Sequence, residues 1–185
     1  MLFRSRPAGE ILFGCMTLRE RAERVLGVPC AAHLSRHALV GFDEPGGALA
    51  IGVDELPLDT TRVLLSSRAV LDFQPVSLPP GPATLVVDGH RAGWVLPPGA
   101  PRPSELWLRD PNTAPAEGPE VRLEGRFLGR PWHVVEHNAE RIAADVHALW
   151  PDDDAPAGVH RVGDHPVSLG EGASIEPGVH LDLRD

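Results

Sequence analysis

The last residues of the chain, "VSLGEGASIEPGVHLDLRD" (167–185), carry a repeat that decides the expected fold of the C-terminal part. Aliphatic side chains recur at every sixth position, in two series offset by two positions. The series are Leu169, Ile175 and Leu181, and Val167, Ala173 and Val179. This spacing fits neither a helix, with its period of about 3.6, nor a free strand, but it is typical of a parallel β-helix. We therefore predict short stacked strands in this segment.

A β-helix coil buries its apolar side only against neighbouring coils, and at least about three repeats are normally needed for stability. Residues 159–185 correspond to roughly one coil. We therefore expect the first coil of a β-helix, and a chain that is part of a longer protein. The alternative is a glycine-rich tail whose residues alternate by chance.

The composition of the 185-residue chain, 42% hydrophobic and 23% charged, is typical of a globular domain with its own core. No apolar run approaches the roughly 20 residues that span a bilayer, and the start lacks a secretory signal pattern. We therefore expect a cytoplasmic protein without a membrane partner. Cys15 and Cys30 form neither a CxxC motif nor a tight metal-binding spacing, so we expect two reduced, buried thiols.

The balance of 17 basic and 26 acidic residues gives a net charge of −9, which argues against a nucleic-acid partner. Every basic residue is arginine, because the sequence contains no lysine. The absence of lysine excludes a Walker A loop, a Schiff-base lysine and a lysine general base.

The clearest local signal predicts an amphipathic helix from Thr17 to Leu26. Thr17 and Glu20 match a capping box, and Gly27 is placed to end the helix. The residues that we assign to the apolar face are Leu18, Ala22, Val25 and Leu26. Those that we assign to the polar face are Arg19, Arg21, Glu23 and Arg24.

Strand composition is found in residues 28–34 and 61–67. Residues 83–87 and 93–96 flank an Asp88-Gly89 turn signal, so we expect a hairpin there. Residues 109–118 are expected to form a loop.

A second helix is predicted over residues 133–150, and the sequence "PDDDAPAG" (151–158) should break it as a linker. We therefore divide the chain into an α/β domain (1–150), this linker and a β-helix segment (159–185).

The second helix contains an HxxEH motif formed by His133, Glu136 and His137. Inverted zinc proteases bind zinc through two such histidines and use the glutamate as a base. A catalytic zinc also needs a third protein ligand, which Glu140, His147 or the acidic linker could donate, and the spacing does not select among them. A zinc hydrolase is therefore one alternative, and a partly exposed helix without a metal is the other.

Several short matches, in order along the chain, resemble a family of sugar nucleotidyltransferases that carry a C-terminal left-handed β-helix. These stretches are "SRPAGEILFGCMTLRERAERVLG" (5–27), "VLLSSRAV" (63–70), "RPWHVVEHNAERIAADV" (130–146) and the closing repeat. The residues that carry the resemblance are Arg6, Pro7, Glu10, Gly14, Thr17, Arg68, Trp132, Val135, Asn138, Ile142 and Asp145. Related proteins include the bifunctional uridylyltransferase that also acetylates glucosamine 1-phosphate.

The resemblance implies an α/β fold with a Rossmann-like nucleotide-diphospho-sugar transferase-type domain, incomplete here, followed by the first coil of a left-handed parallel β-helix. It implies a nucleoside triphosphate and a sugar 1-phosphate as substrates, with Mg²⁺ as cofactor and a role in supplying cell-envelope precursors. The residues that it marks as substrate-binding are Arg6, Glu10, Arg68, Asn138 and Asp145. Acyl transfer and a homotrimer built through the β-helix would be properties of the longer parent protein.

Three departures separate the chain from characterised members. There is no first strand with a glycine-rich nucleotide loop, no phosphate-binding lysine, and no Gly-Asp metal pair after "VLLSS". Two outcomes therefore remain open for the domain: an active transferase, or a domain that is inactive because these parts are missing. A non-catalytic module that binds a sugar phosphate and presents a β-helix is a further alternative.

Overall fold

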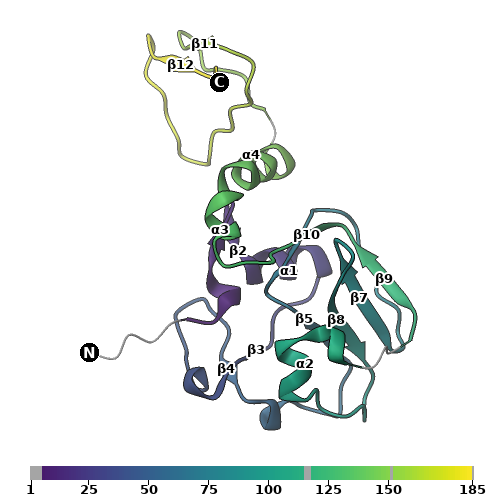
Figure 1. The fold of residues 1–185 in the computed structure, drawn as a ribbon. Helices are drawn as coiled ribbons and strands as arrows, with labels where there is room; N and C mark the ends of the chain where they lie inside the picture. Colours follow the sequence, from purple (N-terminus) through teal and green to yellow (C-terminus); the bar gives the residue numbers. More distant parts are fainter. Residues whose placement is uncertain (1–5, 115–117, 151, 185) are drawn as a thin grey trace.

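A computed structural model describes residues 6–114, 118–150 and 152–184. Parts of four predicted segments therefore lie outside the described residues: the start of the 1–150 domain, positions 115–117 of the predicted loop, Pro151 of the predicted linker and Asp185 of the repeat. The largest sheet has four strands in the order β5-β8-β7-β9 (Figure 1). Its strands are β5 (Arg62–Leu65), β7 (Ala83–Val87), β8 (His90–Leu96) and β9 (Glu120–Leu123).

The central hairpin of this sheet forms where the sequence predicts it. Strands β7 and β8 pair antiparallel and are joined by Asp88 and Gly89, whose φ angles of 50° and 71° are both positive. Two positive φ angles are typical of the tight turns whose twist matches that of a β-hairpin. The predicted strand within residues 61–67 is also confirmed, because β5 pairs antiparallel with β8.

The expected parallel, Rossmann-like sheet does not match the described residues. Only β7 and β9 pair parallel within the four-stranded sheet, and β8 is antiparallel to both of its neighbours. The physical reason is the Asp-Gly turn, because a two-residue connection can join only antiparallel strands. The domain is a mixed α/β structure with several small sheets.

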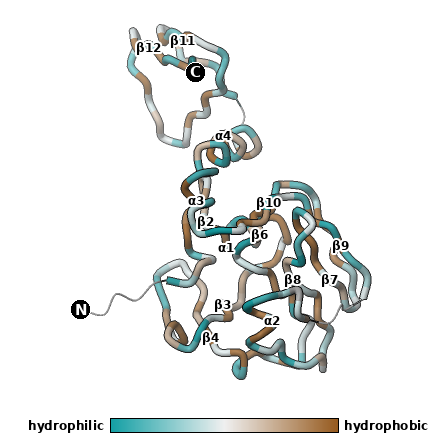
Figure 2. The backbone as a smooth tube through the Cα atoms, viewed as in Figure 1, coloured by the Kyte–Doolittle hydropathy of each residue, from teal (hydrophilic) through white to brown (hydrophobic). Residues whose placement is uncertain are grey.

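The main hydrophobic core lies against β7 and β8, where Figure 2 shows much of the hydrophobic colour. Leu85 and Val87 of β7 are completely buried, together with Leu71 of β6 (Ala69–Leu71). A neighbouring cluster joins Phe13, Leu18 and Val70 to Leu128. The second cluster connects the first helix to the β6–β10 pair, in which β10 spans Gly125–Phe127.

Helix α1 (Leu18–Leu26) confirms the first helix prediction. The Thr17 hydroxyl accepts a hydrogen bond from the Glu20 N–H, the Glu20 carboxylate accepts one from the Thr17 N–H, and Gly27 ends the helix with a φ of 68°. The assignment of Arg21 to the polar face was wrong, because its side chain is only 1% exposed. Arg21 lies three positions after Leu18 and four before Val25, on the buried side of the helix.

The remaining strands of the N-terminal half are short. Strands β1 (Leu12–Phe13) and β2 (Met16–Thr17) form an antiparallel hairpin, and β3 (His33–Leu34) pairs parallel with β4 (Ala50–Ile51). The strand expected over residues 28–34 is thus reduced to its last two residues. The other short elements are α2 (Glu105–Arg109) and 3₁₀ turns at Ala8–Glu10, His37–Leu39, Val53–Glu55 and Pro111–Thr113.

The second predicted helix is divided in two by His137. Helix α3 spans His133–Glu136 and helix α4 spans Asn138–Leu149. His137 separates them with φ −102° and ψ 7°. The HxxEH motif therefore does not lie on one continuous helix, contrary to what its spacing suggested. No helix in the described ranges has the length and apolar character that a membrane span needs.

The C-terminal segment lies beyond α4, away from the four-stranded sheet (Figure 1). Its strands β11 (His160–Val162) and β12 (His180–Asp182) pair parallel, with His160 opposite His180. The rings of these two histidines stack with centroids 4.9 Å apart. The described residues thus contain one parallel strand pair within the predicted β-helix segment (159–185) and no complete β-helix; of the short strands expected over 167–185, only β12 is present.

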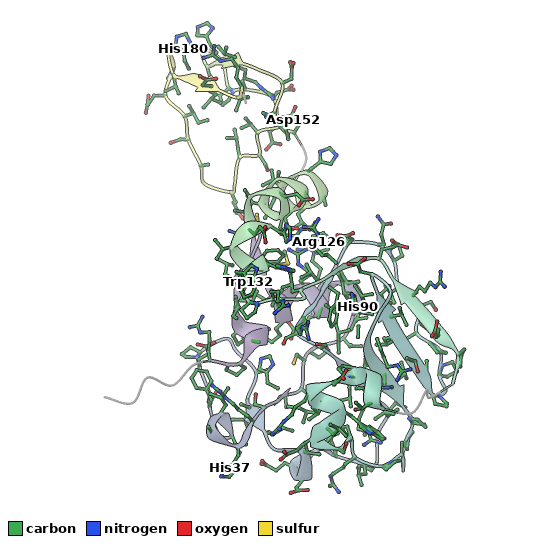
Figure 3. All side chains as sticks on the ribbon, viewed as in Figure 1. His37, His90, Arg126, Trp132, Asp152 and His180 are labelled. Atoms are coloured by element: carbon green, nitrogen blue, oxygen red, sulfur yellow. The ribbon has the colours of Figure 1, made fainter. Side chains whose placement is uncertain are left out.

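Residues of the predicted linker contact the C-terminal segment. The carboxylates of Asp152 and Asp153 accept hydrogen bonds from the backbone N–H groups of Val167 and Leu169, at 2.8 and 2.6 Å. Asp152 also pairs with Arg161 at 3.0 Å. Figure 3 shows Asp152 and His180 in this segment, well away from His90 of the main sheet.

Candidate functional site

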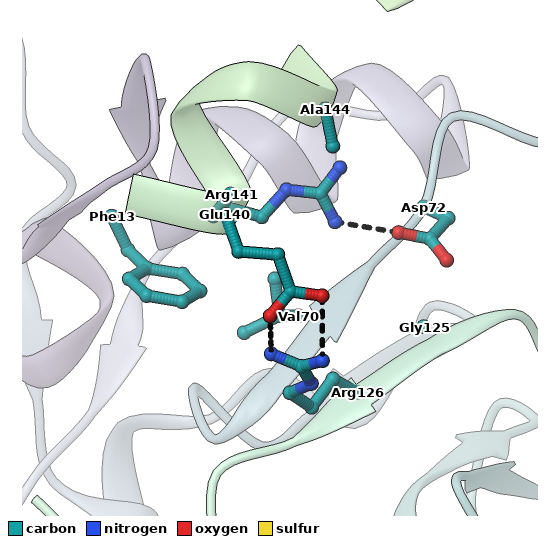
Figure 4. Close-up of a pocket in the computed structure, with 8 residues that line it drawn as sticks. All are labelled: Phe13, Val70, Asp72, Gly125, Arg126, Glu140, Arg141 and Ala144. Atoms are coloured by element: carbon teal, nitrogen blue, oxygen red, sulfur yellow. Dashed lines mark hydrogen bonds and ion pairs between the residues drawn. The ribbon is translucent and has the colours of Figure 1, made fainter. Parts of the chain in front are cut away.

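A pocket of about 280 Å³ lies between helix α4 and the β6–β10 strand pair (Figure 4). Its lining combines an apolar floor with two arginines and two carboxylates. The lining residues are Phe13, Val70, Asp72, Gly125, Arg126, Glu140, Arg141 and Ala144. The charged groups that converge on this pocket make it a candidate ligand site.

Glycine at position 125 is required by the close pairing of β10 with β6. Its φ is 146°, a conformation that side chains rarely adopt, and a Cβ atom there would overlap the carbonyl oxygen of Val70. The close approach places Arg126 beside the pocket, because Arg126 pairs with Val70 across the two strands.

Arg126 and Glu140 form a bidentate ion pair at the mouth of the pocket. The two guanidinium nitrogens of Arg126 donate to the two carboxylate oxygens of Glu140 at 2.9 and 3.1 Å (Figure 4). Hydrogen bonds from Arg126 and its charge lower the pKa of Glu140, and the same hydrogen bonds raise the pKa of Arg126. The two side chains are 40% and 66% exposed, so the pair is open to solvent.

Arg141 contributes the second guanidinium and is held more firmly. Its Nη1 atom donates to the Asp72 carboxylate at 2.6 Å, and its Nε atom lies 2.9 Å from the Oδ1 atom of Asp145. Arg141 is 14% exposed, whereas Asp145 is completely buried. The Nε edge of the guanidinium thus forms an ion pair with the buried carboxylate without a well-aligned hydrogen bond, and the Nη1 atom is hydrogen-bonded to the pocket residue Asp72.

Asn138 and Asp145 are brought together by the turn that joins β1 and β2. The side-chain oxygen of Asn138 accepts a hydrogen bond from the Gly14 N–H at 2.8 Å, and an Asp145 oxygen accepts one from the Cys15 N–H at 3.0 Å. Asp145 is also paired with Arg21 in the interior. Both predicted site residues thus support the pocket from behind, and a direct role in substrate binding stays a prediction.

Arg6 and Glu10 belong to a different cluster in the N-terminal part. The Glu10 carboxylate accepts hydrogen bonds from Arg19 at 2.8 Å and Ala48 N–H at 3.2 Å, and one of its oxygens lies 2.6 Å from His33 Nε2. Burial raises the pKa of Glu10, but the hydrogen bonds from His33 and Arg19 outweigh burial and lower it overall. Arg6 is more exposed and pairs with Glu44 at 3.0 Å.

Arg68 lies against the segment that follows β10. Its guanidinium donates to the carbonyl oxygens of Leu128 at 2.7 Å and Gly129 at 3.0 Å, and lies 4.6 Å from the centre of the Phe127 ring. Through these contacts Arg68 holds the backbone of residues 128 and 129 in place, which is a structural role. Its predicted part in phosphate binding stays a prediction.

The HxxEH motif does not form a recognisable metal centre. The rings of His133 and His137 lie edge to face with centroids 5.3 Å apart. Across 6–114, 118–150 and 152–184, no three histidine, cysteine, aspartate or glutamate side chains gather closely enough to hold a metal ion. The zinc-hydrolase alternative therefore lacks its third ligand within these ranges.

The two cysteines are free thiols, and both are partly exposed instead of buried as expected. Burial is the largest influence on each, and it raises the pKa of both thiols. A raised pKa keeps a thiol protonated at neutral pH, so neither cysteine has the character of a nucleophile.

The pocket residues Asp72, Arg126, Glu140 and Arg141 were not among the predicted substrate-binding residues. One signal was present for Arg141, which lies between Asn138 and Asp145 at helical spacings of three and four on the inward face of α4. Arg126 lies within the short strand β10 and Asp72 follows β6, and the pairing of these strands depends on tertiary structure, so no sequence pattern marked the two residues.

The chain belongs to the sugar nucleotidyl transferase family, whose model matches residues 2–152. The matched range includes every residue that lines the pocket. Comparison with curated proteins and with solved structures returned no match. The membership of a sugar nucleotidyltransferase family predicted from the sequence is therefore confirmed, whereas the likeness to the bifunctional uridylyltransferase stays a prediction.

Proposed function

We propose that this chain binds a nucleoside triphosphate and a sugar 1-phosphate and joins them into a nucleotide sugar. The family match over residues 2–152 carries this proposal. In the reaction, a phosphate oxygen of the sugar 1-phosphate attacks the α-phosphorus of the triphosphate. The bond to the β-phosphate breaks, and pyrophosphate leaves. We place the protein in the cytoplasm, where it would supply cell-envelope precursors.

The pocket offers the charges that this chemistry needs. Phosphoryl transfer depends mainly on positioning and on cationic groups that stabilise the phosphate oxygens. Arg126 presents a two-nitrogen fork of the kind that binds phosphate bidentately, and Arg141 adds a second positive charge beside it. Asn138 and Asp145 would hold helix α4 and Arg141 in place while the ligand is bound.

The family resemblance implies Mg²⁺, and the pocket contains a fitting donor set. Magnesium is usually bound by one or two carboxylates together with substrate phosphates and water. Asp72 is the carboxylate of the pocket lining that would supply such an oxygen while the phosphates are bound. The ion would neutralise charge on the bound phosphates.

A second candidate is a binding module that recognises a sugar phosphate without turnover. The absence of lysine favours this binding module. Characterised members bind phosphate through a lysine, and no position of this chain can supply one. The pocket carboxylates are also both paired with arginines.

For the C-terminal segment we propose the first rung of a parallel β-helix, through which the longer parent protein would form a homotrimer. The in-register parallel pairing of β11 with β12 supports this. Light scattering on a parent protein that carries further repeats tests the trimer, and a monomer at all concentrations would contradict it.

Pyrophosphate release tests the catalytic proposal. A panel of nucleoside triphosphates and sugar 1-phosphates with Mg²⁺ should include one pair that yields pyrophosphate only when both substrates are present. Arg126→Gln should reduce that release. Arg109→Gln, which alters an exposed ion pair with Glu105 outside the pocket, should leave it unchanged. Binding of a sugar phosphate without release under any combination would favour the second candidate.

A further inference from the structure

We propose that Glu140 acts as an internal competitor that occupies the phosphate-binding fork of Arg126 until a ligand phosphate displaces it. The inference rests on the proposed function only for the identity of the ligand as a phosphate compound. It adds a regulatory contact to the site, in which the domain's own carboxylate controls access to a cationic group.

The Arg126–Glu140 pair has the geometry of an arginine–phosphate contact. Both Glu140 oxygens meet Arg126 nitrogens, at 2.9 and 3.1 Å. A phosphate group presents two oxygens to an arginine fork in the same parallel arrangement as a carboxylate. The Glu140 carboxylate therefore stands where a phosphate group would bind, at the mouth of the 280 Å³ pocket.

The Arg126–Glu140 pair is exposed to solvent, so its carboxylate is able to leave. Glu140 is 66% exposed and Arg126 is 40% exposed, and exposed ion pairs contribute little to stability. Glu140 can therefore turn into solvent without disturbing the core. Arg141 behaves differently, because one edge of its guanidinium faces the completely buried Asp145. One arginine of the pocket is thus fixed, and the other is held by an exchangeable partner.

The positive and negative side chains of the pocket lining are equal in number. Asp72 and Glu140 neutralise Arg126 and Arg141 in the pocket lining while Glu140 is in place. When Glu140 leaves, the lining carries one excess positive charge beside an open arginine fork. An anionic group then replaces the lost carboxylate, which is the exchange that we infer.

Isothermal titration with pyrophosphate at low ionic strength tests the competition directly. The variant Glu140→Gln keeps the size of the side chain and removes its charge, so pyrophosphate should bind about tenfold more tightly than to the wild type. Arg126→Gln should weaken binding. In the double variant, Glu140→Gln should give no gain, because the contested fork is gone.

Glu105→Gln is the matched control, since Glu105 forms an exposed ion pair with Arg109 outside the pocket. It should leave pyrophosphate affinity unchanged, and thermal melting should show that all variants remain folded. Unchanged or weaker binding by Glu140→Gln, or no pyrophosphate binding by any variant, would overturn the inference. A gain that persists without Arg126, or one that Glu105→Gln reproduces, would also overturn it.

The outcomes distinguish this inference from the proposed function. Tighter pyrophosphate binding by Glu140→Gln without pyrophosphate release from any substrate pair would support the competition and contradict the transferase. Release by the wild type together with unchanged pyrophosphate affinity in Glu140→Gln would support the transferase and contradict the competition.

Discussion

Asp145 of helix α4 and Arg21 of helix α1 form an ion pair in the interior, with 0% and 1% of their side chains exposed. The same Asp145 oxygen accepts a hydrogen bond from the Cys15 N–H. Arg21 also donates to the carbonyl oxygens of Phe13 at 3.3 Å and Leu71 at 3.5 Å. One buried carboxylate therefore joins both helices to the hairpin that flanks the pocket.

Removal of this carboxylate should destabilise the domain strongly. Asp145→Asn leaves the Arg21 charge buried without a counter-ion, and breaking one side of a buried pair typically costs about 3–5 kcal/mol. Urea unfolding should show a loss of this size. Asp182→Asn, which removes an exposed partner of Arg184, should leave the unfolding midpoint unchanged. Equal small effects in both variants would contradict the account.

Gly14 should tolerate no side chain. Its φ is 73°, its N–H donates to Asn138, and a Cβ atom would overlap an Asp145 carboxylate oxygen. Gly27 has a similar φ of 68° but open space around the Cβ position. Gly27→Ala should therefore cost only about 1 kcal/mol for its conformation, and Gly14→Ala should cost clearly more. Denaturant unfolding of both variants checks this, and equal losses would mean that the turn does not pack as described.

Glu10 should make stability depend on pH in the acid range. Its pKa in the folded state lies below its ordinary value of 4.5, because hydrogen bonds from His33 and Arg19 outweigh the effect of burial. The folded state therefore binds fewer protons, so the contribution is present above pH 4.5 and is lost as the pH falls through the folded pKa.

Unfolding free energies measured from about pH 3 to 7 should therefore fall less steeply toward acid in Glu10→Gln than in the wild type. The exposed Glu171 provides a control, because Glu171→Gln should retain the wild-type slope. If the free energy of unfolding falls equally steeply toward acid in Glu10→Gln and in the wild type, the contacts of Glu10 do not contribute to the pH dependence of stability.

Local elements were predictable from the sequence because their signals are local. The Thr17–Glu20 capping box and the Asp88-Gly89 turn each satisfy backbone groups within a few residues. The burial of Arg21 could also have been anticipated from its helical spacing to Leu18 and Val25. Because arginine is usually exposed, its residue type favoured the solvent-facing side of the helix. Here the buried carboxylate of Asp145, on helix α4, compensates the charge of Arg21.

The sheet order and the pocket depend on contacts that no sequence period encodes. Strand β9 pairs parallel with β7 only after the chain has passed through α2, and the partners Arg126 and Glu140 come from a strand and a helix in different layers. The six-residue series from Val167 to Leu181 includes residues of β12, but β11, the strand with which β12 pairs in parallel, lies before the series. The period could not show that Asp152 and Asp153 would bind this segment.

Zinc should have no specific effect on the protein. His133 and His137 lie on either side of a helix break, and two histidines without a third ligand bind zinc weakly. Equilibrium dialysis should show no stoichiometric zinc, and a chelator should leave the melting temperature unchanged. One tightly bound zinc that is lost in His133→Ala would contradict this prediction.

The most direct test of the central claim is pyrophosphate release by the wild type and Arg126→Gln, measured with paired nucleoside triphosphates and sugar 1-phosphates. We predict release that requires both substrates and is reduced at least about tenfold in Arg126→Gln, because a bidentate phosphate contact is lost. Release that is unaffected by Arg126→Gln would place the site elsewhere. A wild-type protein that neither binds nor converts any of these substrates would contradict the account as a whole.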